Sequence, residues 1–392
     1  MKIFTDMPGG SRTVRYAVIC ILALMAFVSV VQGVRNASQF SQDFQWDAAR
    51  ALTLRMNPYD ESMHPGTYPD AAGFRDYYLQ MEANQFPSLL MLLIPYTFLP
   101  PLVARYAWIV SNLAFTAGII ILLRKTFLKD ADRELFIAAM MLMLAGTPYR
   151  NQLGVGQHTL FSFFFFLLAV WFDEHKHGKT GFAGTVICLF ICYFKYTLTV
   201  PLVLYFVYRK RYARIAVSVI LHVILTVLAA LWLGDSVINM IIKPLKVSSA
   251  LAAEGGMDFG ALLKGSVFAY VLAFAVMIAL LVMALKLDEG MDGQFISVLI
   301  LWSLIITYHR TYDYFVLVVV LAFFIAGERS RGIWIFYSVL ILAVFFVLRI
   351  FSESPPSRMG VGLIYYLFTA AITVIVAAEG SKKGLLKGNK EG

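Results

Sequence analysis

Long apolar segments, separated by short loops that carry lysine and arginine, constrain this chain more than any other feature. A helix needs about 20 apolar residues to cross the hydrocarbon core of a bilayer, and the first such segment runs from Arg15 to Val34. Similar segments follow at residues 86–100, 102–123, 135–149, 159–172, 181–208, 213–233, 265–285, 294–308, 313–327, 332–351 and 359–378. This pattern predicts an all-α polytopic membrane protein of about 12 transmembrane helices, folded as a single integral membrane domain over residues 1–392.

The composition excludes a soluble globular class. The chain is 60% apolar and 15% charged, whereas soluble domains are about 45–50% apolar and 25% charged. The net charge of +9 does not indicate a nucleic-acid partner, because the lysines and arginines cluster at the ends of apolar segments, as membrane topology requires. The three cysteines, Cys20, Cys188 and Cys192, lie within apolar segments. Their spacing suggests neither a disulfide framework nor a metal site, and we expect no cofactor.

The distribution of basic residues predicts which loops face the cytoplasm. The N-terminus, residues 1–14, the basic turn at 209–211 and the tail, residues 379–392, are expected inside. Residues 36–85 form a first external loop that is polar and aromatic, and residues 234–264 form a second external loop that we expect to be flexible. The protein is thus predicted to be a multi-pass protein of the plasma or inner membrane.

The segment at 181–208 has two interpretations. As one long span, it requires 86–100 to cross the membrane and places the basic loops at 124–134 and 173–180 outside. As a tight hairpin broken at residues 194–197, it moves both loops inside and makes the proline-bracketed segment 86–100 re-entrant. The positive-inside rule favours the hairpin.

The first external loop contains two acids and a cation at helical spacing. Residues 41–55 permit a helix that Asn57-Pro58 would end, and on it Asp43, Asp47 and Arg50 would share one face. A carboxylate beside the membrane surface suits a general base. The alternative is the solvated face of an amphipathic interfacial helix, which the spacing alone favours.

Three further polar groups interrupt the apolar segments. Lys195 lies between two apolar runs, where a lysine is costly and indicates function; its ammonium suits a phosphate. A lysine that reaches water from a hairpin tip is the alternative. His309, Arg310 and Asp313 lie in one short turn, which a local Arg310–Asp313 ion pair could simply close. Gln157 and His158 follow Gly156 in a turn that faces outside under the hairpin interpretation.

The order of these features resembles the polyprenol-phosphate-dependent mannosyltransferases of glycosyltransferase family 87, within the GT-C superfamily. The matching motifs are Asp43-Phe44, Ala48-Ala49-Arg50-Ala51-Leu52, Asn57-Pro58-Tyr59-Asp60, Phe86-Pro87, Gly156-Gln157, and Lys195 followed by Pro201 and the basic turn. The segment between Asp60 and Phe86 is longer than is usual in the family, so the acceptor stays open.

The resemblance implies an inverting glycosyltransferase that uses a polyprenyl-phosphate sugar, with mannose as the sugar, on the outer face of the membrane. The acceptor would be a hydroxyl of a lipid or glycan, and membrane lipids would surround the protein. Asp43 would be the base, with Asp47 as its rival; an Asp47–Arg50 pair would leave Asp43 available. Lys195 and Arg310 would bind the donor phosphate. Sugar and acceptor contacts would come from Asp47, Arg50, Gln157, His158, His309 and Asp313, without a metal.

A transporter or flippase for a lipid-linked or anionic substrate is the alternative function. Such a protein would also use charged groups within the membrane, which Lys195 and the 309–313 turn supply. The long polar first loop and the lack of a visible internal repeat weigh against it.

Overall fold

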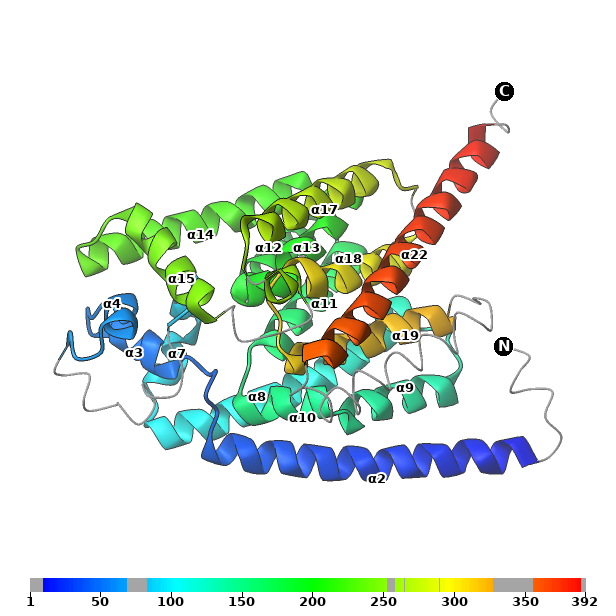
Figure 1. Ribbon diagram of the computed structural model, residues 1–392, viewed down its shortest axis with the longest axis horizontal. Coiled ribbons are helices and arrows are strands. Elements are labelled where there is room, and N and C mark those ends of the chain that lie inside the picture. Colours follow the sequence, from blue (N-terminus) through cyan, green and yellow to red (C-terminus); the bar gives the residue numbers. More distant parts are fainter. Residues whose placement is uncertain are drawn as a thin grey trace.

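The computed structural model describes residues 10–68, 83–251, 258–263, 265–288, 290–326 and 355–388. Every regular element within these ranges is a helix, which confirms the all-α prediction (Figure 1). Six helical runs are long and apolar enough to cross a membrane: Thr13–Gln39, Pro101–Phe127, Gly178–Tyr208, Tyr212–Leu233, Val267–Lys286 and Gly362–Glu379. The protein is therefore polytopic.

The helices α10 (Thr147–Val155) and α11 (Thr159–His175) would together form a seventh span, although the chain bends by 104° between them. Shorter apolar helices complete the bundle, among them α9 (Arg133–Ala145), α18 (Asp292–Ile306) and α19 (Leu317–Ala326). The expected number of about 12 transmembrane helices is not confirmed, and the predicted segment 332–351 lies outside the described residues.

The helices have two distinct ends. We call the end that carries the basic turn 209–211 the basic end, and the opposite end, where α2 (Gly10–Gln39) finishes, the site end. At the site end, the short helices α3 (Trp46–Thr53), α4 (Pro58–Met63) and α7 (Ile94–Thr97) gather beside α15 (Val237–Leu251), where α14 (Tyr212–Leu233) ends (Figure 1).

The run Gly178–Tyr208 is long enough for one span, but it doubles back. It consists of α12 (Gly178–Cys192), a 3-10 turn at Tyr193–Lys195 and α13 (Tyr196–Tyr208). The Lys195 amide donates to Ser162 Oγ near the start of α11, at 2.8 Å. Arg211, just beyond α13, pairs with Asp173 near the end of α11, at 2.9 Å. Since α13 therefore runs parallel to α11, and α12 begins next to the end of α11, the contacts support the hairpin.

The segment 86–100 begins and ends at the site end. It forms α6 (Pro87–Leu90), the 3-10 turn η2 (Met91–Leu93) and α7, and a helical rise of 1.5 Å per residue is too short here for the hydrocarbon core. The carbonyl of Gln85 accepts from Tyr59 Oη at 2.6 Å, and that of Tyr96 accepts from Trp46 Nε1 at 2.9 Å. Both ends thus contact the first loop, which is the re-entrant arrangement.

The prediction that Asp43 shares a helical face with Asp47 and Arg50 is wrong. Helix α3 starts only at Trp46, because Ser41 and Gln45 adopt left-handed backbone conformations with φ of 41° and 61°. The Asp43 amide donates to the carbonyl of Val155 in α10, at 2.8 Å. This contact with a distant helix holds Asp43 in the turn that precedes α3.

The described part of residues 234–264 is largely helical, which differs from the flexible loop that the composition predicted. This segment contains α15 and the short helix α16 (Phe259–Leu262). Ser236 Oγ accepts from the Asn239 amide at 3.1 Å, which is a typical helix start. Met240 is fully buried against the first loop, in an apolar cluster with Leu52 and Tyr59. Packing between the two loops therefore supports a helix that composition alone did not predict.

Candidate active site

A polar pocket lies at the site end, where the loop before α3, the α10–α11 turn, the 193–195 turn and the loop after α18 meet. Its lining residues come from segments far apart in the sequence: Asp43, Gln45, Asn84, Gln85, Gln157, His158, Phe194, Lys195, Tyr196, Thr197, Ser248, Tyr308, Arg310 and Tyr312. Five of the residues expected from the sequence thus lie in one pocket, namely Asp43, Gln157, His158, Lys195 and Arg310.

Asp43 supplies the carboxylate of the polar pocket. Its side chain is almost fully buried and accepts a hydrogen bond from Gln157 Nε2 at 3.1 Å. Burial raises the pKa of Asp43 to about 6, and the positive charges of Lys195 and Arg310 limit the rise. A carboxylate with this pKa is ionised at neutral pH yet basic enough to accept a proton.

The Gly156-Gln157-His158 turn ties this carboxylate to the rest of the pocket. Gly156 ends α10 with φ of 70°, a conformation that favours glycine. Gln157 Nε2 also donates to Tyr312 Oη at 2.9 Å, and its Oε1 accepts from the His158 amide at 2.7 Å. The His158 Nε2 lies 3.0 Å from the carbonyl oxygen of Phe44. Gln157 therefore has a fixed orientation between Asp43 and Tyr312.

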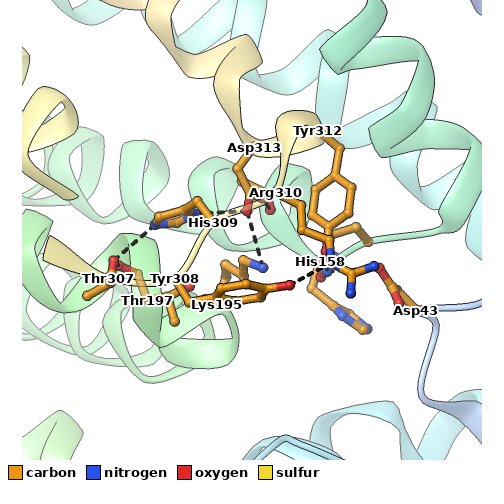
Figure 2. Close-up of polar contacts among 12 residues, drawn as sticks. Asp43, His158, Lys195, Thr197, Thr307, Tyr308, His309, Arg310, Tyr312 and Asp313 are labelled. Atoms are coloured by element: carbon orange, nitrogen blue, oxygen red, sulfur yellow. Dashed lines mark hydrogen bonds and ion pairs between the residues drawn. The ribbon is translucent and has the colours of Figure 1, made fainter. Parts of the chain in front are cut away.

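Lys195 occupies the 193–195 turn, and its ammonium is paired with a carboxylate behind the pocket. Its Nζ lies 3.5 Å from Asp313 Oδ2. Asp313 is fully buried, lies 2.8 Å from His309 Nδ1 and accepts a hydrogen bond from Thr159. His309 Nε2 is in turn 3.0 Å from Thr307 Oγ1 (Figure 2). This buried network fixes the lysine at the pocket wall.

Arg310 brings a second cation to the same pocket. Its Nε donates to Tyr308 Oη at 2.5 Å, and its side chain extends towards Asp43 (Figure 2). Both cations and the Asp43 carboxylate therefore border one space. Such a space can hold an anionic group against the cations while a neighbouring group loses a proton to the carboxylate.

The remaining predicted site residues lie elsewhere. His309 and Asp313 are fully buried and do not line the polar pocket. Asp47 and Arg50 belong to α3 and are not among its lining residues either. Burial raises the pKa of Asp47 to about 7. Within the described ranges, no salt bridge joins Asp47 to Arg50.

Sequence reasoning missed most of the uncharged lining residues. Asn84 and Gln85 directly precede the Phe86-Pro87 motif, and Tyr196 and Thr197 directly follow Lys195. Their positions next to these motifs could have identified them as candidate lining residues. No sequence feature pointed to Ser248, because the segment that forms α15 was expected to be a loop. Within the part of the chain that the structure describes, no group of three or more metal-ligating side chains could hold a metal ion.

An apolar cavity of about 290 Å³ adjoins the polar pocket. Tyr196 lines both spaces, so they meet at this residue. The other residues of the apolar cavity come mainly from α6, α14 and α15: Phe86, Ser88, Leu89, Tyr193, Val200, Val219, His222, Val223, Thr226, Val237 and Ile241. The arrangement can bind a molecule that has a charged head and an apolar tail.

Comparison with known proteins adds one finding. The model of glycosyltransferase family 87 matches residues 87–377, about three quarters of the chain. No curated protein and no solved structure matches the chain.

Proposed function

The chain belongs to glycosyltransferase family 87 and is a membrane glycosyltransferase, and from this premise we propose that it transfers a sugar from a polyprenyl-phosphate donor to an acceptor hydroxyl. Mannose is the sugar that the family resemblance suggests, and the acceptor is a lipid or glycan. The observation that carries the proposal is the shared pocket, in which Asp43 faces Lys195 and Arg310.

The chemistry assigns one role to each charged group. Asp43 accepts the proton of the acceptor hydroxyl as the acceptor oxygen forms its bond to the anomeric carbon of the sugar. The bond between that carbon and the phosphate oxygen breaks on the opposite face, and its electron pair leaves with the phosphate, which inverts the configuration. Lys195 and Arg310 stabilise the negative charge that develops on the phosphate.

The apolar cavity supports a lipid-linked donor. Its walls are largely aliphatic and aromatic, so the first units of an isoprenoid chain would be buried favourably there. Because Tyr196 lies at the junction with the polar pocket, a donor whose chain occupies the apolar cavity would have its phosphate beside Lys195. The basic turn 209–211 lies at the far end of α13 from Lys195, which by the positive-inside rule supports a pocket on the outer face of the membrane.

Transfer of label tests the proposal directly. Purified protein in proteoliposomes receives radiolabelled polyprenyl-phosphate mannose together with lipid and glycan acceptors, and products are separated from donor. We expect label in a new lipid or glycan product. Movement of intact donor across the bilayer, without any covalent product, would contradict the proposal and favour a flippase.

The rate of transfer is expected to rise with pH through about 6 and then level off. Asp43 must be ionised to accept a proton, and its pKa is about 6, so protonation below that pH removes the base. Replacing Lys195 with methionine removes a charge that lowers this pKa, and the midpoint of any residual activity should move to higher pH. A pH profile of kcat/KM that is flat between pH 5 and 8 would contradict the assignment of Asp43 as base.

Transfer is expected to continue at an undiminished rate in excess EDTA. Lys195 and Arg310 already place two positive charges at the pocket, where a divalent cation would otherwise stabilise a leaving phosphate. The measurement compares initial rates with EDTA, with Mg²⁺ and with Mn²⁺. A loss of activity that added Mg²⁺ restores would overturn this prediction.

A further inference from the structure

The Asn57-Pro58-Tyr59-Asp60 motif has no part in the proposed chemistry, since none of its residues lines the polar pocket. The motif starts α4 at the site end, and the Asn57 side chain accepts from the Tyr59 amide at 3.1 Å and the Asp60 amide at 3.4 Å. These hydrogen bonds cap the helix and fix the directions of the remaining side chains. The contacts that the side chains of Asn57, Tyr59 and Asp60 make with other segments indicate what the motif does.

Tyr59 holds one wall of the polar pocket. Its side chain is fully buried, and its Oη donates to the carbonyl of Gln85 at 2.6 Å. Gln85 lines the polar pocket, and its Nε2 donates to Asn84 Oδ1, a neighbouring lining residue, at 3.1 Å. The tyrosine therefore fixes the two amides that precede the re-entrant segment. Amide side chains both donate to and accept from hydroxyl groups.

Asn57 and Asp60 hold the second loop. Lys243 of α15 places its Nζ 2.8 Å from Asp60 Oδ1 and 2.6 Å from Asp235 Oδ2. Asn57 Nδ2 donates to the same Asp235 oxygen at 3.0 Å. The ammonium, two carboxylates and an amide form one network between the loops, which is more effective than an isolated surface ion pair.

The helix that this network holds borders both binding spaces. Val237 and Ile241, at its start, line the apolar cavity, and Ser248, near its end, lines the polar pocket. Tyr196, the residue common to both spaces, donates from its Oη to Ser248 Oγ at 3.3 Å. A shift of α15 would therefore change the apolar cavity and the part of the polar pocket that Tyr196 and Ser248 form, which is the junction where the donor phosphate would lie.

We propose that the 57–60 motif is a positioning element: Asn57 and Asp60 hold α15 in place over the donor's binding spaces, and Tyr59 holds the amide wall that binds the acceptor's hydroxyls. The inference rests on the proposed function, because it assigns each half of the motif to one substrate. Neither half touches the reacting atoms, so the motif controls substrate binding and leaves the proton transfer to Asp43.

The test distinguishes the role of Asn57 and Asp60 from the role of Tyr59 by which KM changes, that of the donor or that of the acceptor. Lys243→Met should raise the donor KM about fivefold, the size of effect that a partly exposed ion-pair network supports, with the acceptor KM and kcat nearly unchanged. Lys243→Arg, which keeps the charge, should restore much of the donor KM. Tyr59→Phe should raise the acceptor KM and leave the donor KM unchanged, since it removes only the hydrogen bond to the Gln85 carbonyl.

Arg15→Met is the matched control. It breaks a 3.1 Å salt bridge to Glu134 near the start of α2, far from the pocket, and should change neither KM. Equal effects of Lys243→Met on both KM values, or a lower kcat with unchanged KM, would overturn the positioning role. If Lys243→Met does not fold, Asp60→Asn tests the same contact.

Hydrogen exchange gives a reading that does not depend on transfer. Backbone amides of residues 237–248 should exchange faster in Lys243→Met than in wild type, and at the wild-type rate in Arg15→Met. Unchanged exchange in Lys243→Met would overturn the inference even if the enzyme is active. Absence of transfer by wild-type protein would instead contradict the proposed function, and the exchange experiment would still decide whether the motif holds α15.

Discussion

Asp43→Asn is expected to lower kcat for sugar transfer by about 10²–10⁴-fold, the typical contribution of a general base. Asparagine has the same shape and can still accept the hydrogen bond from Gln157, but its amide cannot take the proton of the acceptor hydroxyl. Both KM values should therefore change little. Initial rates in proteoliposomes, at saturating donor and acceptor, measure the effect.

Asp47→Asn is the matched control for this variant. Asp47 is also buried and lies only four residues further along the chain, but it is outside the polar pocket. It should retain kcat within a few-fold of wild type, since it is not among the residues that line the polar pocket. Retained transfer by Asp43→Asn together with a loss in Asp47→Asn would show that Asp47, the rival from the sequence, is the base.

Lys195→Met is expected to reduce transfer by about 10²–10³-fold, the typical effect of removing one charge-stabilising group from an active site. It should also destabilise the protein by about 3 kcal/mol, because the buried Asp313 carboxylate loses one of its partners. Rates in proteoliposomes and thermal unfolding of the detergent-purified protein measure the two losses separately.

The double variant Lys195→Met/Asp313→Asn distinguishes a role in catalysis from a role in folding. Without the Asp313 charge, the neutral pair should recover most of the thermal stability, while transfer should stay low because the phosphate still lacks its cation. Recovery of activity along with stability would mean that Lys195 only neutralises Asp313, and Arg310 would then be the cation that binds phosphate.

Much of the helical architecture was predictable, because membrane segments must satisfy their own backbone hydrogen bonds. The basic loops at 124–134 and 173–180 favoured the hairpin, which the contact of Arg211 with Asp173 supports. The loop around Asp43 was not predictable from local spacing. Its left-handed residues depend on a hydrogen bond to Val155, more than 100 residues away, and the helix in the second loop depends on contacts with α4.

The candidate site was likewise predictable only in part. Lys195 and Arg310 could be singled out because charge is costly among apolar residues, and both line the pocket with Asp43. The sequence suggested that Asp313 either binds sugar or pairs with Arg310. Its contacts with Lys195 and His309 required a fold that brings the 193–195 turn beside the 307–313 loop, and no local pattern encodes that distance.

Under the proposed topology, the shortness of α13 sets the depth of Lys195 in the bilayer. Thirteen residues of helix rise about 20 Å, whereas the hydrocarbon core is about 30 Å thick. With the 209–211 turn at one surface, Lys195 therefore lies about 10 Å beneath the other surface. The phosphate of the proposed lipid donor would then lie below the lipid–water boundary, and the acceptor hydroxyl would have to reach the same depth. Under the proposed function, bilayer lipids with longer acyl chains would place the site deeper, and transfer is expected to be slower in a thicker bilayer.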